Sequence, residues 1–503
     1  MSARWINRHD FIVVVPVADR PRHIQACLGS LHECLRRFPY AGRIRVLIAD
    51  DSADAASIAA NGRIAKECSA PGLEVVHFPP AEQYALVQSL GLALPRILGD
   101  APPERYGHKG QGAMRNIAYL KALEWLRGES DNTLVWSIDS DQEFRVNAPD
   151  TEGYVVDFFN GLNAIFAQTD AQVLTGKVVG DPPVSPAVMT QNFLDDVLAF
   201  FDQMAACDPA APCSYHDAPA AADAAYHDMA DLFGIRPAAS YAYPCPLNGV
   251  HSEADCFTHF SARANSFFYG EHPTRVSAYQ PGDLFASVQP ARTVYAGNYV
   301  FRPAALRYFI PFAPLRLRMS GPTLGRILKA ELGGRFVSAN LPMLHKRTVE
   351  SGGQAEFRPG IETSASTIDM SGEFERQFYG DVMLFSVEKL TAEGALCRRA
   401  SAEFYTVLEN TRGSLLERYN ARQRAILARL EPLDVLLADP ARWWHDGAAG
   451  FRQFAANVRR NFDSASSGHA CINDEHNWAQ WRGRLGEALT HYAEDRAAWL
   501  RLI

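Results

Sequence analysis

The sequence lacks a disulfide framework and any long apolar run. Its nine cysteines are an odd number scattered over 503 residues, which argues against a secreted, disulfide-bonded scaffold and favours a reducing cytoplasm. The apolar stretch 11–17 is far too short to cross a bilayer, and no small-residue cleavage site follows it as in a signal peptide. We therefore expect a cytoplasmic protein with no transmembrane segment.

An excess of basic charge is also missing. The formal net charge is −8, and the 49 basic and 57 acidic residues are interspersed, so nothing indicates a nucleic-acid-binding surface. A content of 47% hydrophobic and 21% charged residues is typical of a soluble globular protein. The length is enough for roughly three domains.

Strand and helix patterns alternate through the first 206 residues. Short apolar runs rich in Val and Ile predict buried strands, and amphipathic stretches between them predict helices. The predicted strands include FIVVVPV at 11–17, RIRVLIAD at 43–50, LEVVHF at 73–78 and TLVWSIDSD at 133–141. Such alternation predicts an α/β fold with a mostly parallel sheet covered by helices on both faces.

Carboxylates stand where three of these predicted strands end. They are Asp19 after the first strand, Asp50 and Asp51 after the second, and Asp139 and Asp141 after the fourth. One acidic strand end is often an ordinary loop residue, but ligands bind beyond the carboxyl ends of parallel strands. The Asp-Ser-Asp triplet suits Mg²⁺ or Mn²⁺ and leaves positions for phosphate oxygens. If the strand continues through it, both carboxylates point the same way, with Asp141 nearer the rim and Asp139 deeper.

A glycine-rich stretch, HKGQG at 108–112, precedes a predicted helix. Gly110 and Gly112 would let the backbone approach a ligand, and the helix N-terminus offers free N–H groups. Lys109 and Arg115 add positive charge, so the stretch predicts an anion site for which a diphosphate is the natural ligand. The alternative is an ordinary helix start with solvated basic side chains.

Four segments together resemble a known family. FIVVVPVADRPRHIQACLGSL, VLIADDS, HKGQGAMRNIAYLKAL and WSIDSDQEF follow the order and spacing of GT-A glycosyltransferases, especially the family 2-like group. The resemblance covers roughly residues 10–180 and resumes at 293–347. There, YAGNYVFRPAALRYF is similar to the acceptor-side strand and helix, and PMLHKRT to the late strand that brings a His to the metal.

The resemblance implies a Rossmann-like GT-A sheet, a UDP- or GDP-sugar donor, and Mn²⁺ or Mg²⁺. It implies that the metal is held by Asp139, Asp141 and His345, although a lone His is more often structural. It makes Arg115, which would face the diphosphate, a catalytic residue together with the two aspartates. The residues expected to bind the nucleotide sugar are Pro16, Asp19, Asp50, Asp51, Lys109, Arg115 and Asp139.

One segment departs from the family pattern. Many inverting relatives carry Glu-Asp at the start of the helix after the acceptor strand, where this chain has Ser-Gly-Pro at 320–322. Another carboxylate such as Asp283 or Glu271 could be the base, the reaction could retain anomeric configuration, or the correspondence could be displaced. Arg316 and Arg318, beside this segment, suit an anionic acceptor; solvated loop arginines are the alternative.

The stretch 207–290 does not fit the core pattern and is expected to be an insert or lid near the acceptor site. It is rich in Cys, His and Pro, and two Cys-x-x-His pairs, Cys213/His216 and Cys256/His259, have spacing suited to structural zinc. Their long separation and the missing Cys-x-x-Cys favour a metal-free loop instead.

The remaining chain divides into four further predicted parts. Residues 1–206 are the nucleotide-sugar half of the GT-A domain, and 291–347 are its acceptor and metal side. Residues 348–372 are a linker or mobile loop, and 373–503 form a C-terminal helical domain with dense Glu/Arg pairing. The helical part is expected to bind the acceptor, to form a homodimer or only to cover the core.

The sequence therefore predicts a metal-dependent glycosyltransferase, a hexosyltransferase in the first instance, acting on an unknown acceptor. A catalytically silent nucleotide- or sugar-binding protein is the alternative, because the Glu-Asp pair is missing. A nucleotidylyltransferase ranks lower, since PVADRPRH at 16–23 lacks the glycine-rich basic loop that such an enzyme needs after the first strand.

Overall fold

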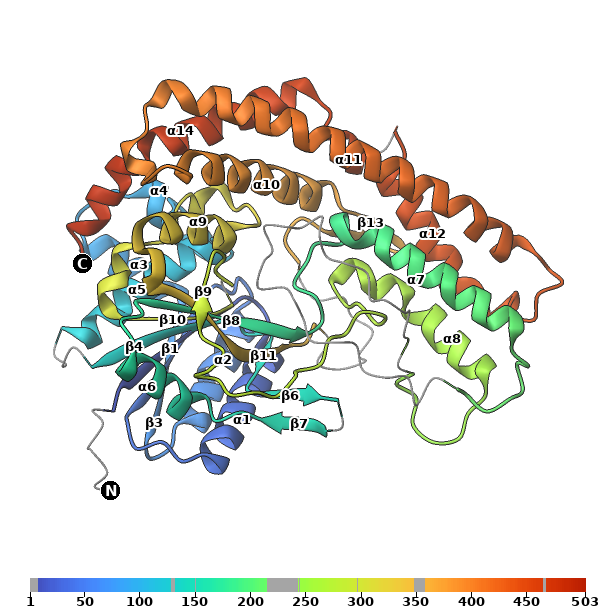
Figure 1. Ribbon diagram of the computed structural model, residues 1–503, viewed down its shortest axis with the longest axis horizontal. Helices are drawn as coiled ribbons and strands as arrows, with labels where there is room; N and C mark the ends of the chain where they lie inside the picture. The colour runs from blue at the N-terminus through green and yellow to red at the C-terminus, as the bar shows by residue number, and fades with distance from the viewer. Residues whose placement is uncertain are drawn as a thin grey trace.

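The computed structural model describes residues 8–127, 132–149, 151–214, 243, 245–295, 297–347, 358–464 and 467–503. His216 and residues 348–357 of the predicted linker lie outside these ranges. The described chain forms one mixed sheet with helices on both faces, and a helical C-terminal part arches over one side (Figure 1).

The main sheet has the order β3-β2-β1-β4-β10-β8-β11-β5, and β9 pairs with β11. β1 lies parallel to both β2 and β4, β8 lies parallel to β11, and β10 is antiparallel to both of its neighbours. The order 3-2-1-4 is that of a Rossmann-like sheet, so the predicted α/β class is confirmed. The strands are β1 (Asp10–Val17), β2 (Ile44–Asp50), β3 (Leu73–Phe78), β4 (Thr133–Ile138), β5 (Gln142–Glu143), β8 (Val173–Gly180), β9 (Gln289–Pro290), β10 (Asn298–Phe301) and β11 (Phe336–His345).

Alternate side chains of β1 belong to two separate cores. Phe11, Val13 and Val15 pack with residues of α1, α2 and α6, whereas Ile12 and Val14 belong to a core with α5, α7 and α9. This follows from the two-residue period of a strand that is buried on both faces. These helices are α1 (Pro21–Arg37), α2 (Ala55–Cys68), α5 (Gln111–Leu126), α6 (Phe158–Gln168), α7 (Pro186–Ala206) and α9 (Ser320–Leu332).

The C-terminal helices share the core of α5 and α9 and cover that face of the sheet. In Figure 1, the long α11 runs along the outer side above α10, while α12 lies with α7 and α8 at the far end. The indole N–H of Trp499 donates to the carbonyl oxygen of Leu306 at 2.6 Å, which ties the last helix to the sheet region. These helices are α8 (Glu253–Arg263), α10 (Ser371–Thr391), α11 (Ser401–Ala438), α12 (Ala449–Phe462), α13 (Ser467–Ala470) and α14 (Glu475–Leu500).

Two hairpins and several short helices complete the described fold. Part of the predicted linker is the hairpin of β12 (Glu362–Ser364) and β13 (Thr367–Asp369). β6 (Arg145–Ala148) and β7 (Thr151–Val155) form the other hairpin. The short helices are α3 (Pro80–Ser89), α4 (Pro95–Leu98), and the 3₁₀ segments Pro103–Arg105, Ala264–Tyr269, Pro303–Arg307, Ala313–Leu315, Gly333–Arg335, Leu396–Arg398 and Asp446–Ala448. No helix in the described ranges is both long and apolar enough to cross a membrane.

Candidate active site

A cavity of about 650 Å³ lies beyond the ends of β1 and β4. The Asp139–Gln142 turn, the segment after β1, the start of α5 and the segment before α9 all line it. Of the residues expected at the site, five line the cavity: Pro16, Asp51, Asp139, Asp141 and His345. Four others, Asp19, Asp50, Lys109 and Arg115, do not line it.

The Asp-Ser-Asp triplet forms a turn. β4 ends at Ile138, so the expected continuation of the strand through the triplet is wrong. The N–H of Asp139 donates to Oε1 of Gln142 at 3.1 Å, and the N–H of Gln142 donates to the carbonyl oxygen of Asp139 at 3.2 Å. Gly297 packs against this turn so closely that an added Cβ would lie 2.6 Å from Oδ2 of Asp139. The turn brings both carboxylates to the cavity.

Asp141 is more deeply buried than Asp139, which is the reverse of the expected order. The side chain of Asp141 is 6% exposed and that of Asp139 is 24% exposed. Asp139 accepts a hydrogen bond of 2.7 Å from Nε2 of Gln111 and pairs with the guanidinium of Arg115. Burial, together with the nearby Asp141 carboxylate, raises the pKa of Asp139 against the opposing effect of Arg115.

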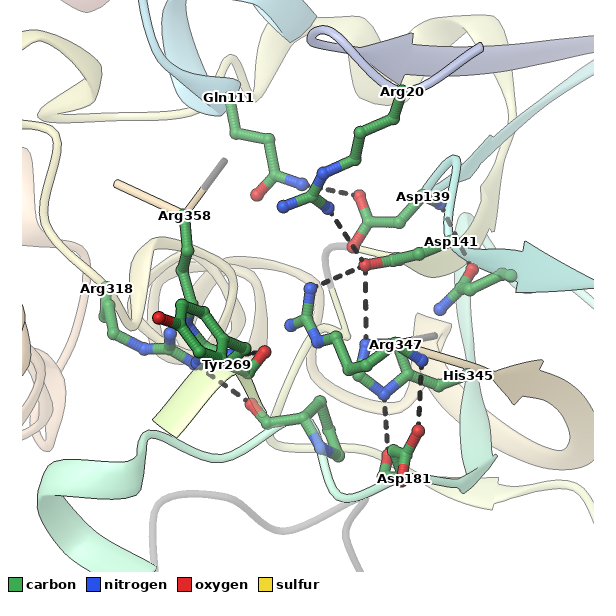
Figure 2. A network of polar contacts seen from close by, with 12 residues as sticks. Arg20, Gln111, Asp139, Asp141, Asp181, Tyr269, Arg318, His345, Arg347 and Arg358 are labelled. Atoms are coloured by element: carbon green, nitrogen blue, oxygen red, sulfur yellow. Dashed lines mark hydrogen bonds and ion pairs between the residues drawn. The ribbon is translucent and has the colours of Figure 1, made fainter. Parts of the chain in front are cut away.

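Asp141 is surrounded by cationic groups (Figure 2). Its Oδ2 accepts a hydrogen bond of 2.6 Å from Nη1 of Arg347, and Nη1 of Arg20 lies 3.4 Å away. Burial alone would raise the pKa of Asp141, but the charges of Arg347 and Arg20 outweigh it and hold that pKa well below its usual range. Asp141 is therefore ionised at neutral pH and attracts cations.

His345 is oriented as a metal-binding imidazole would be. Its Nδ1 lies 2.6 Å from the carbonyl oxygen of Asp181; since that oxygen only accepts, Nδ1 carries the proton. In the neutral ring the lone pair then belongs to Nε2, which lies 3.6 Å from Oδ2 of Asp141. Two acceptor atoms facing each other leave a position where one cation would satisfy both.

The predicted anion site at the start of α5 is taken by a carboxylate of the protein. Asp51 accepts the backbone N–H groups of Lys109 and Gly110, at 3.0 and 3.1 Å, and pairs with Nζ of Lys109 at 2.7 Å. The side chain of Lys109 is 1% exposed, and burial lowers its pKa against the effect of Asp51. The two N–H groups and the ammonium group of Lys109 therefore bind Asp51.

Three other residues expected at the site form hydrogen bonds and ion pairs with segments around the cavity. Asp50 is fully buried and accepts hydrogen bonds from Nδ2 of Asn61 and, at 2.8 Å, from the imidazole of His77. Asp19, in the left-handed region at φ 52°, accepts the N–H groups of residues 53 and 54 and contacts His108. The guanidinium of Arg115, 1% exposed, lies beneath Asp139 and donates to Ser137. Their contacts position the loops of the cavity.

Six arginines of the described ranges line the same cavity. They are Arg20, Arg316, Arg318, Arg347, Arg358 and Arg376. Sequence reasoning singled out the two before α9 and missed the last three, which come from the segment after β11, the predicted linker and α10. The nearness of Arg347 to His345 in the chain was the available signal for one of them. This concentration of guanidinium groups suits phosphate or carboxylate ligands.

One buried carboxylate compensates three of these arginines. Glu373 is fully buried and pairs with Arg318 at 2.9 Å, Arg376 at 3.4 Å and Arg358 at 3.6 Å. Burial would raise the pKa of Glu373, but the arginines lower it. Burial and the charge of Arg347 hold the pKa of Arg358 well below its usual range. An anionic ligand would relieve the crowding of positive charge.

Neither carboxylate considered as an alternative base reaches the cavity. Asp283 accepts the N–H of Ala286, and Glu271 forms a forked ion pair with Arg263. Within the described chain, the carboxylates that line the cavity are Asp51, Asp139 and Asp141. The Ser-Gly-Pro segment at 320–322 does line it, in the position expected from the sequence.

The Cys- and His-rich insert assembles a different cluster from the one considered in the sequence. Cys213 and Cys256 do meet, but their neighbours are Cys245 and His251. His259 instead has its Nδ1 3.4 Å from the hydroxyl of Tyr243. His216 lies outside the described residues.

Comparison with known proteins gives no family model and no curated protein that matches the sequence. Several solved structures are similar, among them the following two. Mouse xyloside xylosyltransferase 1, in its apo form, shares 9% identity over 66% of this chain and 79% of its own, with a TM-score of 0.24. S. aureus TarS shares 14% identity over 90% of this chain and 55% of its own, with a TM-score of 0.29. This chain therefore spans about half the length of the TarS chain.

The structure itself has the Rossmann-like, mostly parallel sheet with flanking helices and the helical C-terminal part that the sequence predicts. Donor, metal and acceptor are a separate question, which depends on the chemistry of this chain's own cavity.

Proposed function

We propose that the protein is a glycosyltransferase that takes a sugar from a UDP- or GDP-sugar with the help of Mn²⁺ or Mg²⁺. The observation that carries the proposal is the meeting of Asp141 and His345 at the wall of an arginine-rich cavity. Oδ2 of the first lies 3.6 Å from Nε2 of the second, with the other imidazole nitrogen held by a carbonyl oxygen. Asp139 lies in the same turn as Asp141 and lines the same cavity.

The residues present fit a divalent metal. Two carboxylates and a neutral imidazole are ligands that Mn²⁺ accepts and that Mg²⁺ accepts in part. Arg347 already donates to Oδ2 of Asp141, so we expect its guanidinium to turn away when a metal binds. A bound ion would supply positive charge for the leaving diphosphate.

The protein's own groups would do the rest of the binding. Arg347 and Arg20 would turn from Asp141 toward the phosphate oxygens beside the metal ligands and would orient the diphosphate. Nε2 of Gln111 fixes Oδ1 of Asp139 at 2.7 Å, which keeps that carboxylate in place. Asp51, at the cavity wall, would bind the nucleoside through the oxygen lone pairs that Lys109 and Gly110 do not use.

An anionic acceptor accounts for the missing base. A phosphate or carboxylate oxygen is already ionised at neutral pH, so its attack on the sugar needs no proton acceptor. The Ser-Gly-Pro segment of α9 and the guanidinium of Arg316 lie on the cavity wall where relatives of the resembled family carry their base. Arg316 is exposed there and would bind the acceptor anion.

Nucleotide release is the test. The full chain would be incubated with a panel of UDP- and GDP-sugars, with Mn²⁺, Mg²⁺ or EDTA, and with phosphate-bearing, carboxylate-bearing and neutral acceptor sugars. We expect release of free UDP or GDP that requires metal and rises with one of the anionic acceptors. Tight nucleotide binding without any release would favour the catalytically silent alternative, and indifference to every nucleotide would refute the proposal.

A further inference from the structure

A second cluster of metal-binding residue types lies outside the cavity, between α7 and α8. The chain that leaves α7 and the chain that enters α8 run side by side there. The N–H of Cys213 donates to the carbonyl oxygen of His251 at 3.0 Å, and Pro212 forms a bridge with Ser252. Cys256 follows in the first turn of α8. Backbone contacts therefore hold Cys213, His251 and Cys256 in one place.

Four soft or borderline ligand atoms converge at this point. Sγ of Cys245 lies 3.2 Å from Nε2 of His251, and Sγ of Cys213 lies within 4.8 Å of both. The thiol of Cys256 neighbours those of Cys213 and Cys245. In a tetrahedral zinc site with Zn–S bonds of about 2.3 Å, ligand atoms stand ~3.8 Å apart. The cluster therefore needs only small side-chain adjustments to close around one ion.

The imidazole of His251 is oriented for metal binding. Its Nδ1 lies 2.9 Å from the carbonyl oxygen of Gly249, and since that oxygen only accepts, Nδ1 carries the proton. The lone pair of the neutral ring is then on Nε2, the atom that faces the thiol of Cys245. A hydrogen bond from the other nitrogen to a backbone carbonyl is how metal-binding His residues are usually fixed.

A buried carboxylate gives an independent sign of a cation. Glu253 is 2% exposed, and its Oε1 accepts hydrogen bonds from the N–H and hydroxyl of Ser214 at 3.0 and 2.8 Å. Its Oε2 has no hydrogen-bond partner among the described residues. A carboxylate oxygen of Glu253 lies within 4.8 Å of the thiols of Cys213 and Cys256. An unpartnered buried carboxylate is costly, and a dication beside it would offset that cost.

We propose that Cys213, Cys245, His251 and Cys256 bind one structural zinc ion. Three thiolates and an imidazole select zinc over the oxygen-seeking Mg²⁺ and Ca²⁺, and four protein ligands close the coordination shell without an open position for catalysis. None of the four lines the cavity that contains Asp141. The zinc site is therefore distinct from the proposed catalytic metal site.

The ion would fasten the insert to the helical core. It would join the segment after α7, the chain at Cys245 and the first turn of α8. Phe260 of α8 stacks on Tyr243 with ring centroids 4.3 Å apart and packs edge-on against Phe451 of α12 at 5.2 Å. Binding at the thiols thus stabilises the position of α8 against the C-terminal helices, because it ties together segments far apart in sequence.

The experiment is metal analysis of the full chain, purified without chelator from zinc-supplemented medium. We expect about one zinc per chain, as a closed four-ligand site requires. The variant Cys245→Ser should lose at least nine-tenths of it. Cys397→Ser, which changes an exposed cysteine, is the matched control and should keep all of it. Asp141→Asn should also keep its zinc, since its site is a different one.

A second measurement does not depend on a variant folding. Cobalt exchanged into the unmodified chain should give an intense thiolate-to-cobalt band and the visible bands of a tetrahedral site. X-ray absorption at the zinc edge should show sulfur scatterers at about 2.3 Å. Less than about a tenth of an ion per chain, cobalt spectra without a thiolate band, or a disulfide at Cys213, Cys245 or Cys256 in the purified protein would overturn the proposal.

Discussion

Nη1 of Arg347 lies 2.6 Å from Oδ2 of Asp141, the same oxygen that faces Nε2 of His345 at 3.6 Å. The guanidinium and a metal ion would therefore compete for one carboxylate oxygen. In the free protein Arg347 neutralises Asp141. With a nucleotide diphosphate bound, the proposed function needs Arg347 on the phosphates and the ion on the carboxylate.

Arg347→Gln tests whether Arg347 competes with the metal ion for Asp141 and also binds the diphosphate. We expect the variant to bind Mn²⁺ more tightly in the absence of nucleotide, because a competing cation is gone. It should bind nucleotide diphosphate about tenfold more weakly, since a charged hydrogen bond of 1.5 kcal/mol or so is lost. Isothermal titration of each ligand measures both. A variant that loses affinity for metal and nucleotide alike would contradict the competition.

Asp141→Asn should abolish transfer. The amide keeps the shape of the carboxylate but removes the charge that attracts the ion and leaves the diphosphate poorly compensated as the bond to the sugar breaks. A loss of about 4 kcal/mol of transition-state stabilisation would lower kcat about a thousandfold. Initial rates against Mn²⁺ concentration measure it, with circular dichroism as the folding control. Asp100→Asn, at an exposed position, should be normal; near-normal activity of the Asp141 variant would refute the assignment.

Gly297→Ala should impair catalysis with little effect on folding. The added Cβ would lie 2.6 Å from Oδ2 of Asp139 and 2.7 Å from Nε2 of Gln142, so the carboxylate has to move. A displacement of about 1 Å at a reacting centre can lower the rate about a hundredfold. Gly334→Ala is the matched control, because nothing lies within 4 Å of its Cβ position. Equal activity of both variants would show that the position of Asp139 is not critical.

Arg316→Ala should raise the acceptor KM about tenfold and leave the donor KM unchanged. The side chain lines the cavity beside α9, and the proposed function assigns the diphosphate contacts to Arg20 and Arg347. The comparison is steady-state kinetics with the best anionic acceptor, with Arg335→Ala, at an exposed position outside the cavity, as control. Loss of donor affinity instead would place Arg316 at the diphosphate. Arg318 is less suited to this test, because its ion pair with Glu373 is structural.

His272 should make the fold sensitive to mild acid. Burial, and to a smaller extent Arg275, lowers the pKa of His272 from 6.5 to about 3. Between these values the unfolded chain binds a proton that the folded chain does not bind. The contribution of His272 to the free energy of unfolding is therefore complete above pH 6.5 and decreases as the pH falls toward 3. From pH 7.5 to pH 5 this group alone should cost about 2 kcal/mol of unfolding free energy.

Urea unfolding of His272→Leu at the two pH values checks this. The leucine side chain would lie against Phe193 and Phe267, the aromatic neighbours of the imidazole at 5.2 and 5.3 Å. We expect the variant to lose about 2 kcal/mol of pH dependence, whatever its stability at pH 7.5. His476→Gln, at an exposed position, should retain the dependence of the unmodified chain. An unchanged pH dependence in the leucine variant would show that other groups cause it.

The sequence by itself determined the features that depend on neighbours in the chain. The two-residue period of 11–17 and the alternation of strands with amphipathic helices follow from local burial patterns, and they were enough for the α/β class. Asp139 and Asp141 could be assigned to the cavity because they immediately follow a buried strand. Their relative depth could not, since the chain turns at Asp139 under a contact with Gly297, which is far away in sequence.

Only the tertiary structure decided which distant charges meet. Arg347, Arg358 and Arg376 come from three segments, and nothing local distinguishes them from solvated arginines before the fold collects them around Asp141 and Glu373. The same holds for the cysteines, where backbone pairing of the chain at Cys213 with that at His251 selected partners that sequence spacing did not. Ion pairs and metal sites form between side chains that are close in space. For segments that are remote in the sequence, that distance is set only when the core has formed and the loops between them have closed.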